Sequence, residues 1–448
     1  MTMLATAENS KRYLIVGLGL TGLSCARFCQ QQGLNFALCD TREQFAGADA
    51  VRAEFPGTDL HLGSPESSFL CEFDEVLVSP GISAQTDNFI QAAGQGVVIS
   101  GDIQLFREYA QKPVVAITGS NGKSTVTTLV NELINAAGFN AVAGGNLGTP
   151  ALDLLNEEDV DFYVLELSSF QLETTADLAA EVAVILNISP DHMDRYSSMR
   201  DYERAKQRIF RSANKAVVNL DDDHTRPAMA AVKEFVTFGL NARADFGLIN
   251  LDGEDWLAME SEPLLAASEL KIRGSHNQAN ALAALALVSE LGIDVKQCLN
   301  ALKNFAGLAH RCQWVRELDG VNYFNDSKGT NTGSTEAAVK GLSAGLQGRI
   351  ILLAGGEGKG QSFTGLGQTC AGVADVIAYG ADSDIITAEM SPFCVVSQTD
   401  TLQQALLQAR TQARPGDIIL LSPACASFDQ FKNYQHRGDV FCELVEDL

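Results

Sequence analysis

A glycine turn between an apolar strand and a helix carries the residue types that bind and transfer phosphate. The stretch 114–125 reads VVAITGSNGKST, and its turn residues are Gly119, Ser120, Asn121, Gly122, Lys123, Ser124 and Thr125. Backbone N–H groups of such a turn, with those at the start of the next helix, form a cradle for polyphosphate. Lys123 adds a mobile charge for the terminal phosphates, and the Ser124 hydroxyl is suited to Mg²⁺. Ile117 stands where the G-x-x-x-x-G-K-[ST] pattern has its first glycine, so the turn is a shortened variant of a nucleotide site.

A second glycine turn lies near the N-terminus. Its residues are Gly17, Leu18, Gly19, Leu20, Thr21 and Gly22, a complete G-x-G-x-x-G between a strand predicted at 13–17 and a helix predicted at 21–32. Asp40 ends the next strand, at about the distance where a ribose-binding acid belongs. The pattern is typical of a nicotinamide-dependent oxidoreductase, yet the turn binds any diphosphate and the acid binds any ribose or nearby polar group. Both interpretations stay open at this point.

Two polar side chains follow strands downstream of the phosphate turn. Glu166 ends a strand predicted at 161–166, and His192 follows a strand predicted at 182–187. Because strand carboxyl ends converge on the nucleotide in mononucleotide folds, both residues should face Lys123. Glu166 is suited to bind Mg²⁺, the alternative being a solvated acid. His192 is suited to bind metal or substrate, the alternative being an ordinary packed or surface histidine.

Two later helices carry residues with a plain structural interpretation. The helix predicted at 201–210 is amphipathic, and Lys206 on it is expected from this segment alone to be solvated. A strongly apolar helix is predicted at 279–291. Asn280 then lies in its first turn, where it either caps the helix or faces a ligand.

The last part of the chain again alternates strands with helical stretches. Strands are predicted at 321–324, 349–354, 375–379, 393–396 and 417–421. Polar clusters follow three of them, at 325–331, 355–360 and 422–430. Plain turns do not need repeated Lys, Asp and Ser beside their glycines. The three clusters together therefore predict a binding edge at the strand carboxyl ends.

Composition limits the class of protein. A chain of 448 residues suggests about three domains. A net charge of −24 argues against nucleic acid or an anionic membrane as the main partner. No apolar run reaches the roughly 18 residues of a membrane span, and the N-terminal segment lacks the features of a signal peptide, so we expect a cytoplasmic protein. The cysteines form no C-x-x-C pair and the histidines show no zinc-ligand spacing, which indicates reduced thiols and no histidine–cysteine metal site.

The alternation of strands and helices predicts an α/β protein with three domains. These are a Rossmann-like N-terminal domain at residues 1–101, a central P-loop mononucleotide-binding domain at 102–307, and a Rossmann-like α/β C-terminal domain at 308–448. The phosphate turn and the polar edge fall in different domains. We therefore expect the C-terminal domain to close on a nucleotide held by the central one.

Seven strings carry a resemblance to a known family. They are TGSNGKST, ELSSFQLE, NISPDHMDRY, GSHNQANALAA, AHRCQWV, NDSKGTN and LSPACASFDQFKNYQHRG. Together they resemble the Mur ligases, the ATP-dependent amino-acid ligases of bacterial cell-wall synthesis. They occur in order across all three segments, and LSPACASFDQFKN is the most specific of them for the D-glutamate-adding branch.

The resemblance implies a reaction that these residues are suited to support. ATP would phosphorylate the carboxylate of UDP-N-acetylmuramoyl-L-alanine, and the amine of D-glutamate would attack the acyl phosphate and release phosphate. Two anions must meet in line, so catalysis would consist mainly of charge neutralisation and positioning. In this interpretation the N-terminal domain binds the UDP substrate, and the C-terminal domain binds D-glutamate. The chain is expected to act as a monomer on small molecules, without nucleic acid or membrane insertion.

The resemblance also implies roles for individual residues. For catalysis it implies Lys123, His192, Lys206 and Asn146. For ATP it implies the phosphate-turn residues together with Asn280, Arg311 and Asp326. For two Mg²⁺ ions it implies Ser124 and Glu166 at the first site and His192 and Lys206 at the second. For D-glutamate it implies Lys328, Thr330, Lys359, Ser427 and Tyr434, the last where the family often has phenylalanine. For the UDP substrate it implies Gly17, Gly19, Leu20, Thr21, Gly22, Asp40, Thr41, Arg42, Asn146 and Ser168.

Lys206 is the least obvious of these residues. An ammonium group in a site that must hold Mg²⁺ would repel the metal. Similar ligases add CO₂ to the amine, and the resulting carbamate is an anion that offers two oxygens. The resemblance therefore implies a CO₂-derived carbamate on Lys206. The remaining alternatives are the nicotinamide-dependent oxidoreductase, which leaves the phosphate turn without a purpose, and an ATP-driven switch, which leaves the C-terminal edge without one.

Overall fold

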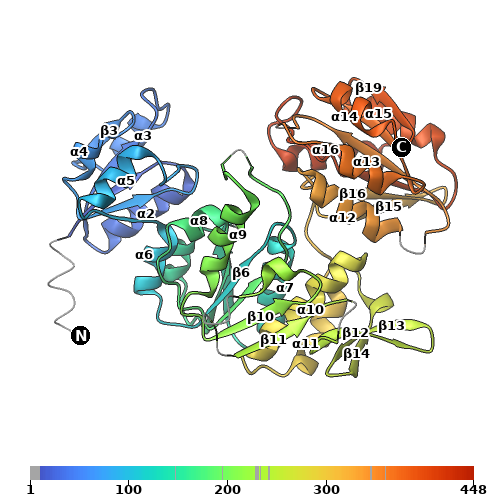
Figure 1. The fold of residues 1–448 in the computed structure, drawn as a ribbon, viewed down its shortest axis with the longest axis horizontal. Helices are drawn as coiled ribbons and strands as arrows, with labels where there is room; N and C mark the ends of the chain where they lie inside the picture. The colour runs from blue at the N-terminus through green and yellow to red at the C-terminus, as the bar shows by residue number, and fades with distance from the viewer. Residues whose placement is uncertain are drawn as a thin grey trace. The chain divides into compact units, whose positions relative to one another are not determined.

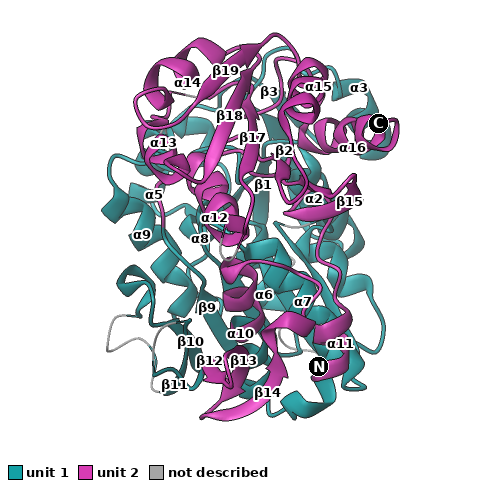
Figure 2. Ribbon diagram, turned by 90° about the vertical axis from the view of Figure 1, so that its right-hand side faces the viewer, with its two compact units in different colours: residues 1–188, 192–246, 283–298 teal, residues 189–191, 247–282, 299–448 magenta. Residues whose placement is uncertain are grey.

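The computed structural model describes residues 11–448 except 147, 194, 228–231, 233, 241–242, 344–345 and 359. The chain forms two compact units, each with more contacts within itself than with the other, and Figure 2 colours them separately. Unit 1 comprises residues 1–188, 192–246 and 283–298, and unit 2 comprises residues 189–191, 247–282 and 299–448. Among the described helices, none combines the length and the apolar character that a membrane span needs.

The first sheet of unit 1 is parallel throughout, in the order β3-β2-β1-β4-β5. Its strands are β1 Arg12–Val16, β2 Asn35–Asp40, β3 Leu60–Leu62, β4 Glu75–Val78 and β5 Val98–Ser100. The helices between them are α2 Leu20–Gln31, α3 Ala48–Glu54, α4 Ser67–Leu70 and α5 Asp87–Gly94. Both sheet faces are covered, which explains the short, uninterrupted apolar strands. β1 and β2 lie where the strands on either side of the glycine turn and its helix were predicted.

The second sheet has nine strands in the order β14-β13-β12-β11-β10-β9-β6-β8-β7. The strands are β6 Val114–Thr118, β7 Ala141–Gly145, β8 Phe162–Glu166, β9 Val182–Ile185, β10 Lys215–Asn219, β11 Glu234–Phe238, β12 Phe246–Leu251, β13 Glu254–Met259 and β14 Glu262–Ala266. The helices are α6 Asp102–Tyr109, α7 Lys123–Ala136, α8 Ser169–Glu173, α9 Met199–Gln207, α10 Ser275–Glu290 and α11 Val295–Asn304. β13 and β14 pair antiparallel. Figure 1 shows β6 in the middle of this region.

The third sheet has six strands in the order β15-β16-β20-β17-β18-β19. The strands are β15 Gln313–Leu318, β16 Val321–Asn325, β17 Ile350–Gly355, β18 Ala374–Tyr379, β19 Val396–Thr399 and β20 Ile418–Leu421. The helices are α12 Thr332–Ser343, α13 Thr364–Cys370, α14 Ser383–Met390, α15 Leu402–Gln412 and α16 Tyr434–Glu446. Along β17, Leu352 belongs to one core and its neighbours Ile351 and Leu353 to another, so the sheet is buried on both faces.

Three mainly parallel sheets with crossover helices confirm the predicted α/β class. The predicted boundaries at residues 101 and 307 stay a prediction. One predicted strand, at 393–396, begins too early. The N–H groups of Phe393 and Cys394 donate to the Met390 carbonyl at the end of α14, so the strand starts only at Val396.

Candidate active site

The phosphate turn lies where three strands of the second sheet end. β6 leads into the turn, with β8 on one side and β9 on the other, and α7 begins directly after it. Gly122 precedes α7 with a φ of 82° and Gly119 has a φ of 156°, so the backbone conformation itself favours glycine at both positions. A side chain on Gly119 would also meet Leu186 and Asn187. The predicted strand, turn and helix are thus present in the predicted order.

Asn187, two residues after β9, fixes the shape of the turn. Its carbonyl accepts from the Ser120 N–H at 2.9 Å. Its side-chain Oδ1 accepts from the Asn121 N–H at 2.8 Å, and its Nδ2 donates to the Asn121 carbonyl at 3.0 Å. The sequence analysis did not single out this residue, although an amide at a strand end beside a phosphate turn was a usable signal. The cradle is therefore held in shape by the protein's own hydrogen bonds.

Lys123 and Ser124 open α7 at the turn. The Lys123 ammonium donates to the carbonyls of Gly119 at 2.8 Å and Ser120 at 2.9 Å, so its charge lies over the turn. The Ser124 side chain is buried. A cation over the turn at the start of a helix suits the terminal phosphates of a nucleotide.

Glu166 ends β8 beside β6 and has the features of a metal ligand. Its side chain is only 2% exposed. Oε1 accepts from Asn146 Nδ2 at 2.7 Å, while the buried Oε2 has no hydrogen-bond partner among the described residues. A buried carboxylate oxygen left without a donor is costly, and a Mg²⁺ ion would satisfy it. In the described ranges, no group of three His, Cys, Asp or Glu side chains is placed to hold a metal ion.

Lys206 corrects the expectation that a lysine on this helix is solvated. It is only 1% exposed, and its ammonium donates to the Gly119 carbonyl at 2.9 Å and lies 4.7 Å from the centre of the Tyr202 ring. Tyr202 in turn contacts the Ser120 hydroxyl at 3.1 Å. Helix α9 begins at Met199, capped by Ser198, and turns this face toward the phosphate turn. Amphipathicity identified the helix but could not show which neighbour its inner face would meet.

His192 lies in the loop between β9 and α9 and is exposed. Its φ is 56°, and its carbonyl accepts from the Arg195 N–H at 2.9 Å and the Tyr196 N–H at 3.2 Å. Its ring centre lies 4.8 Å from that of Phe170 on α8. The His192 ring is thus placed by a tight turn and an aromatic contact.

Ser168 caps α8, with its Oγ accepting from the Gln171 N–H at 3.1 Å.

The N-terminal glycine turn connects β1 to α2. Asp40 Oδ2 accepts from the Leu18 N–H at 3.0 Å, while Oδ1 accepts from Arg42 Nε at 2.7 Å. These hydrogen bonds lower the pKa of Asp40 to about 2, and the bond from the Arg42 side chain has the largest effect. Both oxygens therefore already accept protein donors, from Leu18 and from Arg42. Gly19 and Leu20 are exposed, and Thr21 and Gly22 follow in the first turn of α2.

The edge of the third sheet contains most of the predicted C-terminal residues. Asp326, after β16, accepts from the Ser422 hydroxyl at 2.6 Å and from the Cys312 N–H at 3.0 Å. Burial raises the pKa of Asp326 to about 6, and the neighbouring Arg311 lowers it in part. The Lys328 ammonium lies 4.2 Å from the centre of the Tyr434 ring.

Arg437 holds the loops of this edge together. It has no exposed surface, and it donates to Ser327 Oγ at 2.9 Å, to the Ser327 carbonyl at 2.8 Å and to the Cys425 carbonyl at 3.1 Å. The polar clusters after β16 and β20 are therefore joined by one guanidinium, which the sequence analysis missed. Thr330 and the buried Ser427 lie in these two clusters. Lys359, in the third cluster, lies outside the described residues.

Asn280 does not lie in the first turn of its helix. Helix α10 begins at Ser275, not at 279, so Asn280 lies in the second turn. It is buried, and its Nδ2 donates to Asn277 Oδ1 at 3.1 Å. The helix starts earlier because the N–H groups of Asn277 and Gln278 donate to the Gly274 carbonyl.

Comparison with family models covers most of the chain. Residues 11–101 match the Mur ligase MurD-like N-terminal domain, residues 117–288 the Mur ligase middle domain, and residues 310–425 the Mur ligase glutamate ligase domain. The three matched ranges correspond to the three sheets.

Curated relatives are similar over nearly their full length. The UDP-N-acetylmuramoylalanine--D-glutamate ligase of Pseudomonas fluorescens is 52% identical over 439 residues, which cover 97% of this chain and 98% of the relative. The enzyme of the same name from Pseudomonas aeruginosa is 51% identical with the same coverage.

Solved structures agree in fold at low identity. A pseudomurein peptide ligase type C from Methanothermus fervidus aligns with a TM-score of 0.62 and 18% identity, covering 98% of this chain and 99% of its own. MurF from Acinetobacter baumannii aligns with a TM-score of 0.62 and 18% identity, covering 100% of this chain and 93% of its own.

Proposed function

Because the chain belongs to the Mur ligase family, we propose that it joins D-glutamate to UDP-N-acetylmuramoyl-L-alanine at the expense of ATP, in the synthesis of bacterial peptidoglycan precursors. The observation that carries this proposal is the identity of about half of all residues, over nearly the whole chain, to D-glutamate ligases. The enzyme is an ATP-dependent carbon–nitrogen ligase, and ADP and phosphate are its other products. Since ATP and UDP-linked precursors are made in the cytoplasm, we place the reaction there, catalysed by a monomer.

The central site acts by neutralising and placing phosphoryl groups. A carboxylate is a poor electrophile, so the γ-phosphoryl group of ATP is first transferred to it and gives an acyl phosphate. The amine of D-glutamate then attacks the acyl carbon, and phosphate leaves. Lys123 and the N–H groups of the turn carry the negative charge of the transferring group. Asn280, Arg311 and Asp326 hold the nucleoside and phosphates of ATP.

Metal ions belong to this site as partners of the phosphates. Ser124 and Glu166 would hold one Mg²⁺, and the orphan Oε2 of Glu166 supports this assignment. His192 and a carbamate on Lys206 would hold a second. Bound Mg²⁺ supplies positive charge to the phosphate oxygens. Asn146 orients Glu166 through its 2.7 Å hydrogen bond. Asn146 and Ser168 would approach the muramoyl-alanine end of the substrate.

The carbamate on Lys206 is supported by the burial of the amine. A neutral lysine amine adds to CO₂, forms a carbon–nitrogen bond and loses one proton, which leaves an anion. Burial disfavours the charged ammonium and so favours this step. The position of Lys206 over the Gly119 carbonyl brings the modified group to the phosphate turn.

The outer sites bind the two substrates that are joined. Gly17, Gly19, Leu20, Thr21 and Gly22 cradle the UDP diphosphate, and Asp40, Thr41 and Arg42 flank the uridine. Lys328, Thr330, Lys359, Ser427 and Tyr434 bind D-glutamate. The aromatic ring of Tyr434 supports the Lys328 ammonium in place, which suits recognition of a carboxylate.

A phosphate-release assay tests this function. The enzyme is given ATP, Mg²⁺ and UDP-N-acetylmuramoyl-L-alanine, with D-glutamate, L-glutamate or meso-diaminopimelate offered separately. We expect release only with D-glutamate, together with a product whose mass includes that residue. Release driven by L-glutamate or meso-diaminopimelate would overturn the choice of amino acid. Release without any amino acid would favour an ATP-driven switch.

A further inference from the structure

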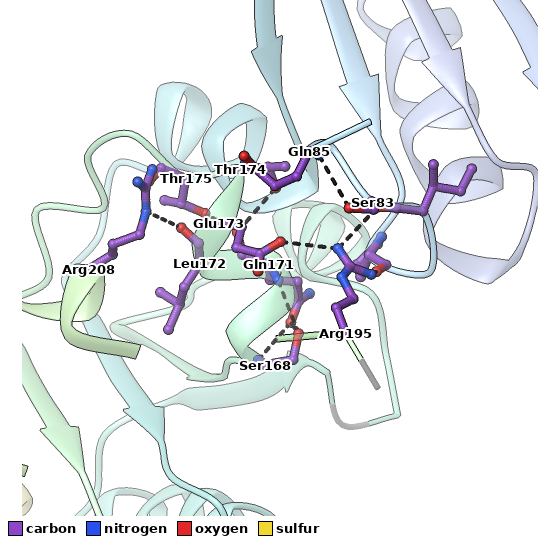
Figure 3. Close-up of polar contacts among 12 residues, drawn as sticks. Ser83, Gln85, Ser168, Gln171, Leu172, Glu173, Thr174, Thr175, Arg195 and Arg208 are labelled. Carbon is purple, nitrogen blue, oxygen red and sulfur yellow. Dashed lines mark hydrogen bonds and ion pairs between the residues drawn. The ribbon is translucent and has the colours of Figure 1, made fainter. Parts of the chain in front are cut away.

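The guanidinium of Arg195 joins two segments that lie far apart in the sequence (Figure 3). Nη1 donates to the Pro80 carbonyl at 3.0 Å, and Nη2 donates to the Ile82 carbonyl at 3.2 Å. Nη2 also pairs with Glu173 Oε2 at 3.1 Å. Pro80 and Ile82 follow β4 in the first sheet, whereas Glu173 ends α8 beside the second. The side chain is only 16% exposed, so these contacts are largely shielded from water.

The loop that Arg195 holds supports the N-terminal glycine turn from behind. Ser79 Oγ donates to the Gly17 carbonyl at 2.7 Å. A side chain on Gly17 would lie 2.7 Å from the end of Ile82, so loop and turn are in direct contact. The Ile82 N–H donates to the Ser79 carbonyl at 2.9 Å and closes the loop. A shift of this loop would therefore shift the turn proposed to hold the UDP diphosphate.

The other side of Arg195 faces the reacting end of the site. Its guanidinium carbon lies 4.1 Å from the centre of the Phe170 ring, the same ring that His192 contacts. Its backbone N–H donates to the His192 carbonyl at 2.9 Å. One residue thus contacts the loop behind the diphosphate turn, the α8 acid and the turn that places His192.

We infer that Arg195 is a positioning residue that sets the distance between the diphosphate end and the reacting end of the UDP-linked substrate. The inference rests on the proposed function, which gives the two turns a single elongated substrate. Binding at the second turn adds affinity for such a substrate only if the two turns keep a separation that matches the substrate's length. A small misplacement at the reacting end also costs rate, because the carboxylate must meet the γ-phosphoryl group in line.

An arginine is needed here for its shape. Its planar fork reaches acceptors on both segments at once, whereas a lysine ammonium is a single point charge. The buried Nε has no hydrogen-bond partner among the described residues, a cost that a residue serving packing alone would not carry. The guanidinium thus joins two segments of the chain, although one of its own N–H donors is left without a hydrogen bond among the described residues.

Arg208 offers a matched comparison because its guanidinium also contacts α8 (Figure 3). Its Nε donates to the Leu172 carbonyl at 2.6 Å and its Nη2 to the Thr175 carbonyl at 2.8 Å. Both acceptors belong to one segment at the end of α8. Arg208 therefore stabilises the same helix as Arg195, but these hydrogen bonds do not connect it to the loop behind the diphosphate turn.

The test compares Arg195→Lys, Glu173→Gln and Arg208→Lys in steady-state kinetics and calorimetry on the full-length enzyme. For Arg195→Lys we expect the KM for UDP-N-acetylmuramoyl-L-alanine to rise about tenfold, with the KM for ATP within twofold of wild type. Glu173→Gln keeps a neutral acceptor for Nη2 and should show the same direction with a smaller effect. Arg208→Lys should lower the melting temperature without changing the ratio of the two KM values.

Binding of UDP alone separates positioning from local damage. UDP lacks the muramoyl-alanine end and reaches only the proposed N-terminal binding residues, so Arg195→Lys should bind it with wild-type affinity while losing affinity for the whole substrate. An equal loss for UDP, or an unchanged KM in a folded Arg195→Lys variant, would overturn the inference. If Arg195→Lys does not fold, an unchanged KM in Glu173→Gln decides against it. A wild-type enzyme that does not ligate D-glutamate would instead refute the proposed function.

Discussion

The two glycine turns of unit 1 have the same position relative to a strand and a helix, but they differ in the charged and polar side chains around them. Each follows a central parallel strand and opens a helix, β1 and α2 in one case and β6 and α7 in the other. Backbone N–H groups at such a place are suited to bind phosphate, and we propose that both turns do so. The second turn adds the charge of Lys123, the buried Ser124 and the nearby Glu166. The N-terminal turn, residues 17 to 22, contains no charged side chain.

The carboxylates beside the two turns differ in the same sense. Asp40 is occupied by the Leu18 N–H and by Arg42, and its pKa of about 2 keeps it ionised and engaged. Glu166 keeps one buried oxygen without a hydrogen bond among the described residues. The first carboxylate closes a binding surface, and the second is available to a metal. The comparison shows that the two turns share a backbone arrangement suited to phosphate and differ in the side chains around it, and we propose that those side chains decide whether the phosphate is held or transferred.

The largest effect is expected from Lys123→Ala. Loss of the charge at the transferring phosphoryl group should lower kcat by about 10²-fold or more. The variant should be checked for folding by its melting temperature, which we expect to stay close to that of wild type. Lys215→Ala is a matched control, since Lys215 also donates to a backbone carbonyl, that of Glu290 at 2.7 Å, outside the site. Phosphate release measures both variants, and a Lys123→Ala enzyme with more than a tenth of wild-type kcat would contradict this role.

Lys206→Ala should be nearly inactive and partly rescued by a small carboxylate. Acetate or formate would fill the place of the carbamate and restore an anion beside the turn. Carbamylation has a readout besides activity: enzyme equilibrated with ¹³C-bicarbonate should show a carbamate carbon resonance that the variant lacks. Near wild-type activity of Lys206→Ala, or rescue by neutral acetamide as large as that by acetate, would argue against an anionic group here.

The sequence predicted local features of the site better than non-local ones. The strand, turn and helix around Lys123 were predictable, because glycine conformations and apolar periodicity are local properties. The burial of Lys206 was not, because α9 meets the turn only through the folding of the second sheet. Asn187 and Arg437 were missed for the same reason: their hydrogen bonds join loops that are distant in sequence. The resemblance to Mur ligases, not the pattern of residues, led to Lys206 as a candidate, whereas the pattern had left Asn280 open between a helix cap and a ligand contact.

Glycine substitutions test whether the N-terminal turn is a binding surface. A side chain on Gly22 would lie 1.9 Å from the Gly17 carbonyl, whereas one on Gly19 would meet no atom within 4 Å. Gly22→Ala should therefore destabilise the protein by about 1–3 kcal/mol, as overpacking does. Gly19→Ala should fold like wild type, with a φ of −83° that alanine accepts. If a diphosphate approaches the open side of Gly19, its KM for the UDP substrate should still rise, about tenfold.

Urea unfolding and substrate kinetics decide between these effects. A Gly19→Ala enzyme with unchanged KM for the UDP substrate would show that the exposed side of the turn does not contact the diphosphate. A Gly22→Ala enzyme of wild-type stability would show that the turn relaxes away from the Gly17 carbonyl at little cost. The first result would weaken the assignment of the first turn to binding, and the second would contradict the expected loss of stability.

The smallest effect concerns Asp102, in the segment between the two turn-bearing sheets. It opens α6 and is buried, with Oδ2 accepting from Gln171 Nε2 at 3.0 Å. Burial raises its pKa to about 6. The folded state therefore binds more protons than the unfolded state between about pH 4 and pH 6, and stability falls as pH rises through this window. Because one pKa unit corresponds to about 1.4 kcal/mol, the loss attributable to Asp102 between pH 5 and pH 7 should be about 1–2 kcal/mol.

Asp102→Asn should remove this dependence and leave the kinetic parameters of both turns unchanged. The neutral amide keeps an oxygen for Gln171 and no longer buries a charge, so the variant should be the more stable protein at pH 7. Asp87→Asn is the control, because Asp87 also opens a helix, α5, but is exposed. Urea unfolding at pH 5, 6 and 7 measures the three proteins. A pH dependence of Asp102→Asn equal to that of wild type would show that Asp102 is not the group that titrates. A changed KM for the UDP substrate would instead show that the joint between the two sheets contributes to binding, and would make the two turns less independent than their side chains indicate.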